Sequence, residues 1–220
     1  MNGVTAPNTI GNVTDSASDD NFALPLLIRT PDSWASVALS DPLALLNDHA
    51  HLEKKAATNA LDLLQRWPQG ECPTEWINAI TAIARDEAQH LALVTRLMKQ
   101  RGGQMSRLHQ VQYAKDLHRE VRYGRANQEL LDRLLISSLI EARSCERYEI
   151  LSRCAGDPQL VKLYKNLWAS ERGHYQLFLE LAKSIAEGPE ITARWQELLE
   201  AEARIIVAQP VGATMHGWVS

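Results

Sequence analysis

EAQH at residues 87–90 and ERGH at residues 171–174 are two copies of the pattern Glu-x-x-His, and they are the most informative part of the sequence. Each follows a long segment in which one glutamate, Glu53 or Glu141, lies among apolar residues. A glutamate from each of two helices and a Glu-x-x-His from each of two others form a carboxylate-bridged metal pair inside a four-helix bundle. The pattern therefore predicts an all-α fold and its chemistry together.

Length and composition suit one folded domain. The chain has 220 residues, 45% of them apolar, and a net charge of -4, which argues against a uniformly basic coat for nucleic acid. The three cysteines show no CxxC spacing, so we expect a reducing, cytoplasmic setting without a disulfide framework. Residues 1–22 are polar, lack the apolar core of a signal peptide, and are expected to be flexible. No apolar run is long enough to cross a bilayer.

Helical periodicity dominates the region from Pro42 to Gly188, without strand-like alternation. Proline and glycine breaks predict four long helices at about 41–67, 73–102, 127–155 and 158–188. A stretch of mixed helical character, 105–123, joins the second to the third, and a shorter helix is expected at about 190–207. We therefore predict a four-helix bundle with additional helices over residues 23–207, followed by a tail, 208–220.

The candidate ligands share the inward faces of these helices. Residues spaced alternately three and four apart lie on one helix face. Along three of the helices, apolar stripes contain Glu53, the pair Glu87 and His90, and the pair Glu171 and His174. The third long helix has a less apolar stripe, which still centres on Glu141.

Buried carboxylates that converge repel one another unless cations neutralise them. Carboxylate oxygens with two imidazoles suit iron or manganese better than a thiolate-rich zinc site. The Glu-x-x-His pattern alone is weak evidence, because this composition gives about half a match by chance, and coincidental buried ion pairs are the alternative. The inward placement and the twofold repeat favour a two-metal site with these ligands: Glu53, Glu87, His90, Glu141, Glu171 and His174.

Glu141 is the ligand most open to correction. Glu146 lies five residues further on and would face the bundle after a small rotation of the helix. If Glu141 is the ligand, Glu146 and Arg143 either support the site or form surface ion pairs. Four nearby aromatic residues are interpreted as structural, packing or solvent-exposed, and no chemistry is assigned to them: His49, His51, Tyr148 and Tyr164.

Four strings around the ligands resemble one family: DHAHLEKKAA (48–57), IARDEAQH (83–90), LIEARSCERY (139–148) and SERGHYQLF (170–178). They are similar to the tRNA 2-methylthio-N6-isopentenyladenosine hydroxylases, the MiaE family, over about residues 25–207. The resemblance implies a ferritin-like fold and a diiron centre that activates dioxygen, with the six residues above as iron ligands. It also implies hydroxylation of the isopentenyl group beside the anticodon, with electrons from a separate reductase or ferredoxin. The tail ATMHGWVS departs from the expected RFHSG, so no role is carried over to His216.

A tRNA substrate requires cationic contacts to phosphates. Residues 96–125 contain eight basic and two acidic side chains within an acidic protein. We expect Lys115, Arg119, Arg122 and Arg125 to contact the anticodon stem-loop, with assistance from three rings, those of Tyr113, His118 and Tyr123. A solvated helix face is the alternative interpretation of this stretch.

Other functional classes fit the metal pattern without the resemblance. A ferritin-like iron-oxidising or storage protein would use a similar site, and so would a peroxide-detoxifying protein such as a manganese catalase. A rubrerythrin-type peroxidase usually adds a cysteine-rich iron centre, which these three cysteines do not suggest. An RNA-binding bundle without metal chemistry would keep tRNA binding after loss of the ligands.

Overall fold

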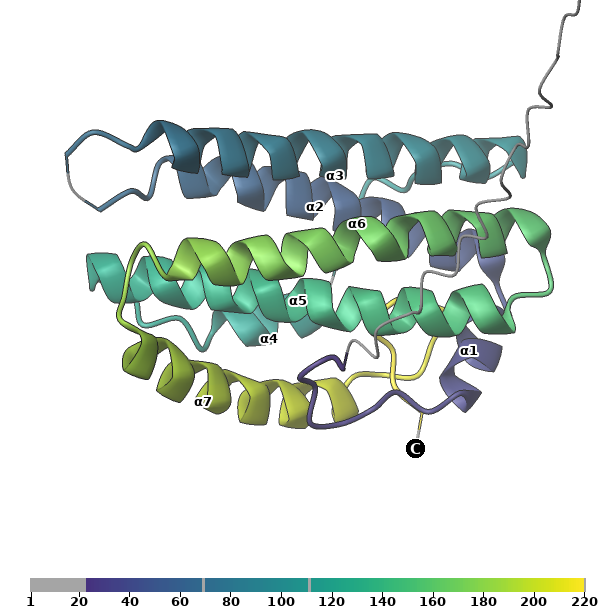
Figure 1. Cartoon of the computed structure of the whole chain (residues 1–220). Helices are drawn as coiled ribbons and strands as arrows, with labels where there is room; N and C mark the ends of the chain where they lie inside the picture. Colours follow the sequence, from purple (N-terminus) through teal and green to yellow (C-terminus); the bar gives the residue numbers. More distant parts are fainter. Residues whose placement is uncertain (1–22, 69, 111, 220) are drawn as a thin grey trace, which may run out of the picture.

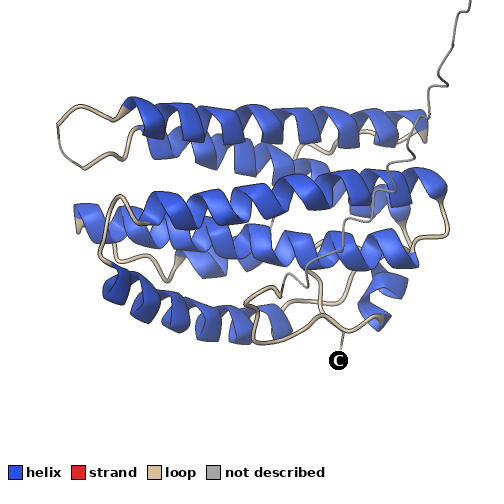
Figure 2. Ribbon diagram, in the orientation of Figure 1, coloured by secondary structure: helices blue, strands red, loops and turns tan. Residues whose placement is uncertain are grey.

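The structure is a computed structural model that describes residues 23–68, 70–110 and 112–219. Within these residues the chain forms seven helices and no strand, which confirms the all-α prediction (Figure 2). The expected flexibility of residues 1–22 lies outside the described residues.

Four long helices form the bundle: α2 (Pro42–Leu64), α3 (Thr74–Gln100), α5 (Ala126–Cys154) and α6 (Pro158–Ala182). They pack as two helical hairpins, α2 with α3 and α5 with α6, which lie against each other (Figure 1). Asp41 caps the start of α2 by accepting a hydrogen bond from the Ala44 amide at 3.0 Å, and Asp157 caps α6 by accepting one from the Gln159 amide at 2.8 Å. Each aspartate is followed by a proline, which suits the first turn of a helix.

Three shorter helices surround one side of the bundle: α1 (Ser33–Ala38), α4 (Gln112–His118) and α7 (Gly188–Val207). All three contact α5, and α7 runs along it on the face away from α3 (Figure 1). The sequence did not predict α1. The predicted end of α6 at Gly188 is also wrong, because a turn after Ala182 ends that helix and Gly188 begins α7.

The central position of α5 explains its weak apolar stripe. It is covered by α6 and by the three shorter helices, so most of its circumference is buried. Its polar residues must therefore find partners inside the protein. Asp132, for example, is buried and accepts from Arg122 and Arg194.

Two apolar cores occupy the two ends of the bundle. One core contains Ile83, Leu134 and Phe178, and the other contains Leu46, Val94 and Leu167. Between them along each long helix lie the glutamates and histidines of the two-metal pattern. A polar layer thus crosses the bundle between two apolar layers.

Residues 208–219 fold back against the bundle without forming a helix. The Met215 amide donates to Asp48 Oδ2 at 2.7 Å, and both Met215 and His216 are buried. A Cβ atom at Gly217 would lie 3.0 Å from the Gly212 carbonyl oxygen, so a larger residue would fit this turn only if its neighbours shifted. None of the described helices has the length and apolar character needed to span a membrane.

Candidate metal centre

The structure brings all six predicted ligands together, from all four long helices. Two groups form, and within each group the potential ligand atoms lie within 4.8 Å of one another. The first contains Glu53, Glu87, His90 and Glu171, and the second contains Glu87, Glu141, Glu171 and His174. Glu87 and Glu171 belong to both groups. The geometry is therefore that of two adjacent cation sites with two shared carboxylates.

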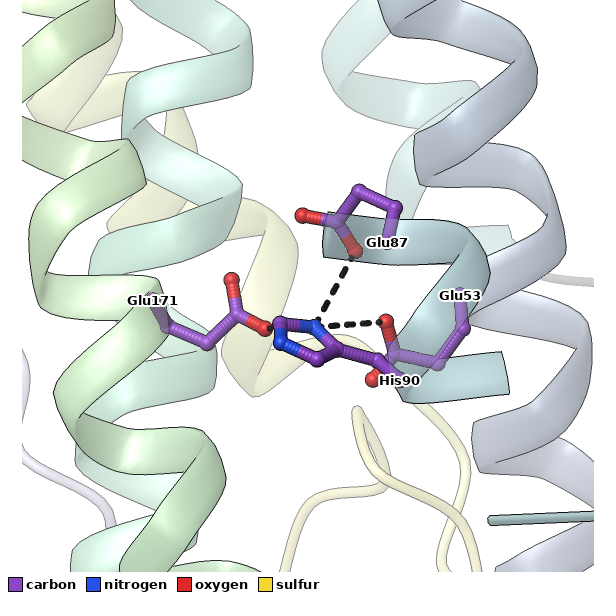
Figure 3. Close-up of side chains that lie close together, drawn as sticks. All are labelled: Glu53, Glu87, His90 and Glu171. Carbon is purple, nitrogen blue, oxygen red and sulfur yellow. Dashed lines mark ion pairs between the residues drawn. The ribbon is translucent and has the colours of Figure 1, made fainter. Parts of the chain in front are cut away.

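The distances within the cluster are short. His90 Nδ1 lies 3.1 Å from Glu171 Oε1 and 3.6 Å from oxygens of Glu53 and Glu87 (Figure 3). His174 Nδ1 lies 2.7 Å from Glu87 Oε1 and 3.3 Å from Glu171 Oε2. All six side chains are buried, so water cannot screen their charges.

Burial and mutual repulsion divide the four carboxyls into two kinds. Burial and the charge of Glu171 raise the pKa of Glu87 to about 8, and burial with the charges of Glu171 and Glu87 raises the pKa of Glu141 well above its usual value. Burial acts in the same direction on the other two, but hydrogen bonds outweigh it. Those from His49 and His90 lower the pKa of Glu53, and those from His174 and His90 lower the pKa of Glu171 to about 2.

The two imidazoles respond to the same charges. Burial lowers the pKa of each, but bonds to the surrounding glutamates outweigh it and raise the pKa of His90 to about 12 and that of His174 to about 10. In the protein without ions, protons therefore supply positive charge to the cluster at neutral pH. Two divalent ions would supply the four positive charges that four carboxylates require.

The hydrogen bonding of the cluster also supports a metal site. Several buried atoms of the cluster make no well-formed hydrogen bond to any described residue, although ion-pair partners lie 2.7 to 3.7 Å away: both Glu87 oxygens, Glu171 Oε1, His90 Nδ1 and His174 Nε2. Buried polar atoms are nearly always paired, and carboxylate oxygens with imidazole nitrogens suit iron or manganese. The cluster is thus compatible with a metal site.

The structure separates Glu141 from Glu146. Glu141 lies in the cluster, whereas Glu146 accepts from Thr30 Oγ1 at 2.5 Å and from Arg143. Arg143 also donates to both oxygens of Glu202 on α7 at 2.8 Å. The surface ion pairs considered for Arg143 and Glu146 are wrong, because both side chains are buried.

Three side chains that were assigned no chemistry from the sequence lie next to the cluster. His49 Nε2 lies 2.5 Å from Glu53 Oε1, and the Tyr148 hydroxyl donates to the same oxygen at 3.0 Å. Asp86 Oδ2 lies 3.7 Å from His174 Nε2. The available signal was spacing, since His49 precedes Glu53 by one helical turn and Asp86 adjoins Glu87.

A cavity of about 510 Å³ leads from the surface to the cluster. Its inner wall includes four glutamates of the cluster, and Leu52, Ala56 and Ile140 contribute apolar surface. Three exposed lysines, Lys54, Lys55 and Lys115, line it as well. Lys54 and Lys55 were not among the residues predicted to bind tRNA. They directly follow the inward-facing Glu53 on α2 and are exposed.

The basic side chains of the predicted tRNA-binding stretch differ in their exposure and in their partners. Lys115 lines the cavity, and Arg119 and Arg125 are exposed, although Arg119 bonds Asp116 at 2.6 Å. The guanidinium of Arg122 is bound to the buried Asp132, at 2.8 and 3.0 Å. The tRNA contacts of all four basic side chains remain predictions.

The three rings of this stretch also differ. Tyr113 is fully buried, so the expectation that it assists at an RNA-facing surface is wrong. Tyr123 is exposed, and His118 is partly buried and lines the cavity.

Comparison with known proteins agrees with this architecture. One solved structure, "Protein 43 with aldehyde deformylating oxygenase activity from Synechococcus", superposes with a TM-score of 0.80 at 35% identity, covering 88% of this chain and 96% of that one. That neighbour has a ferritin-like fold, which confirms the predicted fold class.

Two relatives carry the name tRNA 2-(methylsulfanyl)-N(6)-isopentenyladenosine(37) hydroxylase. The one from Pseudomonas putida is 38% identical over 82% of this chain and 85% of its own length. The one from Salmonella typhimurium is 31% identical over 78% of this chain and 61% of its own length. The family model described as tRNA-(MS2IO6A)-hydroxylase (MiaE) matches residues 20–217, so the resemblance is confirmed and the chain belongs to the MiaE family of tRNA hydroxylases.

Proposed function

We propose that this protein is a non-haem diiron monooxygenase acting on 2-methylthio-N6-isopentenyladenosine next to the anticodon of tRNA. It hydroxylates the isopentenyl side chain with dioxygen and external electrons. The observation that carries the proposal is the buried cluster of four glutamates and two histidines at the inner wall of a lysine-lined cavity. The names of the two relatives support the choice of substrate.

Each iron ion would have two ligands of its own and two shared ligands. Glu53 and His90 would hold one ion, Glu141 and His174 would hold the other, and Glu87 and Glu171 would bridge them. When bound and reduced, such a pair supplies the chemistry that activates dioxygen for attack on a C–H bond.

The protein's own residues place the substrate. The apolar wall formed by Leu52, Ala56 and Ile140 suits the isopentenyl group and excludes water beside the cluster. Lys54, Lys55 and Lys115 suit the phosphates of the nucleotide whose base enters. A base in a single-stranded anticodon loop can be splayed into such a pocket at little cost in stacking.

The overall reaction sets the remaining requirements. One oxygen atom of dioxygen enters the substrate and the other leaves as water, which consumes two electrons and two protons. The sequence carries no flavin or nicotinamide motif, so we propose a separate reductase or ferredoxin as the donor. We place the reaction in the cytoplasm, where its tRNA substrate is found.

The test is a direct assay of the modified nucleoside. The iron-loaded, reduced protein is incubated in air with tRNA that carries the 2-methylthio-isopentenyl modification. The tRNA is then digested to nucleosides, and their masses are measured by mass spectrometry. We expect a gain of one oxygen atom on the modified adenosine, and none with the Glu87→Ala variant. An unchanged mass with the loaded wild-type protein would refute the assignment.

Aldehydes are the second substrate class to test, because the name of the structural neighbour includes aldehyde deformylating oxygenase activity and the cavity wall is partly apolar. Turnover of a long-chain aldehyde without any change in the tRNA would favour that activity instead. Rapid ferrous-ion oxidation in a large hollow assembly, without RNA turnover, would favour the iron-storage alternative.

A further inference from the structure

His216 belongs to the C-terminal tail, yet it lines the cavity that contains the cluster. It also lines a smaller pocket of about 110 Å³, together with Asp48, Gln209 and Thr214. Among the described residues, His216 is the one that lines both spaces. The tail therefore contributes a side chain to the substrate cavity.

Both ring nitrogens of His216 lack a hydrogen-bond partner among the described residues, although the side chain is only 6% exposed. A buried imidazole normally has at least one partner, because an unpaired polar group inside a protein is costly. A histidine that is retained in this state inside a binding cavity is suited to bond with what enters the cavity.

The orientation of the ring is fixed from two sides. It stacks on Tyr113 with ring centroids 4.2 Å apart and planes 13° apart, and the Tyr113 hydroxyl donates to the buried Glu202 at 3.0 Å. The preceding residue, Met215, is anchored through its amide to Asp48. The ring is thus held in place before any ligand binds, which lowers the entropic cost of a contact.

His216 is suited to donate a hydrogen bond and not to carry a charge. Burial lowers its pKa to about 3; the charge of Asp48 acts against this change, and the guanidinium charges of Arg147 and Arg143 add to it. The imidazole is therefore neutral at physiological pH, with one N–H donor and one acceptor nitrogen.

The chemistry of the substrate indicates which atoms His216 meets. In N6-isopentenyladenosine the side chain that reacts is attached at N6, and the ring nitrogens N1 and N7 flank that position. If the isopentenyl group points toward the carboxylates, the N1 and N7 edges face the walls beside them. Both nitrogens are hydrogen-bond acceptors, so each fits a donor N–H.

We propose that His216 is a substrate-binding residue whose ring N–H donates a hydrogen bond to N1 or N7 of the modified adenine. This proposal rests on the proposed function of the site. It assigns to the tail a part in recognising the base, in addition to the lysines that suit its phosphates.

The test combines a protein variant with replacement of one ring nitrogen of the ligand by a C–H group. Dissociation constants are measured for anticodon stem-loop oligonucleotides that carry 2-methylthio-N6-isopentenyladenosine or its 1-deaza or 7-deaza form. We expect His216→Phe to weaken binding of the parent about tenfold. One deaza form should weaken binding to the wild-type protein by a similar factor, and that loss should be absent in His216→Phe.

Two variants guard against a merely structural effect. His216→Asn retains a donor N–H and should restore part of the discrimination between the parent and the deaza form. Thr214 belongs to the same tail but lines only the smaller pocket, so Thr214→Val should behave as wild type. Because each comparison is a ratio within one variant, partial unfolding cancels. Equal discrimination by the wild type and His216→Phe would overturn the proposal.

Failure of this inference can be told apart from failure of the proposed function. If the loaded wild-type protein hydroxylates the parent oligonucleotide but neither deaza form binds more weakly, only the role of His216 falls. If the wild-type protein neither binds nor hydroxylates the parent, both proposals fall.

Discussion

Glu141 and Glu146 lie five residues apart on α5 and serve different parts of the protein. Glu141 belongs to the carboxylate cluster, and Glu146 is bound by Arg143 and Thr30. Five residues turn an α-helix through about 500°, which is one full turn and about 140° more, so the two carboxylates face different neighbours.

Alanine substitutions should separate these two roles. Glu141→Ala should lower the bound iron below two ions per chain and leave the metal-free protein as stable as wild type or more stable, because it removes a repelling carboxylate. Glu146→Ala should cost about 1–3 kcal/mol of unfolding free energy, because the buried Arg143 and Thr30 lose a partner while Arg143 keeps its bonds to Glu202. Metal analysis and urea unfolding measure the two effects. Iron loss in Glu146→Ala with full iron in Glu141→Ala would reverse the ligand assignment.

Removal of metal should destabilise the wild-type chain. Ions that bind only the folded state raise the free energy of unfolding in proportion to the logarithm of their concentration over Kd. We expect a chelator to lower the melting temperature of the loaded protein. The melting temperature of Glu87→Ala, which lacks a carboxylate common to both ligand groups, should not respond to iron or to chelator. An equal response in both proteins would show that the ions bind elsewhere.

Two tyrosines near the site offer a matched comparison. The Tyr148 hydroxyl lies between His49 Nε2, at 2.8 Å, and Glu53 Oε1, at 3.0 Å, whereas the Tyr164 hydroxyl has no hydrogen bond to any described residue. Groups that orient metal ligands typically change affinity or activity by about 10–100-fold when they are removed. Tyr148→Phe should therefore weaken iron binding or turnover by about that factor, and Tyr164→Phe should leave both unchanged. Iron titrations and hydroxylation rates provide the measurements.

The lysines at the cavity should govern the salt dependence of tRNA binding. Charge reversal at Lys55 and Lys115 should weaken binding of all tRNA sequences similarly and reduce the salt slope by about one for each lost phosphate contact. Lys165, an exposed residue of α6 that does not line the cavity, is the matched control. Identical slopes for the wild type and the Lys55 and Lys115 variants would exclude these contacts.

Arg122 should respond differently from Arg119. Arg122→Ala removes a buried ion-pair partner of Asp132, so we expect a loss of about 1–3 kcal/mol in unfolding free energy, moderated by the remaining bond from Arg194. Arg119→Ala should leave stability almost unchanged, because its side chain is 72% exposed. Filter binding and thermal unfolding of both variants separate contact with tRNA from a structural role. A stable Arg122 variant with strongly weakened binding would support the original expectation for Arg122.

The fold and the cluster were predictable because they depend on local periodicity. The Glu-x-x-His spacing places both side chains on one helix face, and apolar neighbours show that this face is inward. The same rule favoured Glu141 over Glu146, and the structure brings Glu141 into the cluster.

What the sequence did not predict depends on contacts between distant segments. The burial of Arg143 and Glu146 follows from α7 and the segment around Thr30, which cover α5 from outside the bundle. His216 reaches the cavity only because the tail folds back onto Asp48 and Tyr113. No spacing rule relates residues so far apart along the chain, and the tail has no periodicity to interpret.

The division of the ligands between the two hairpins affects how the protein opens. Each of the two ligand groups takes side chains from α2 or α3 and from α5 or α6, so the hairpins cannot separate while both ions are bound. Amide hydrogens in the middle turns of the four long helices should therefore exchange with solvent at a rate limited by release of metal. Amides of the tail and of α1, which hold no ligand, should open independently of it.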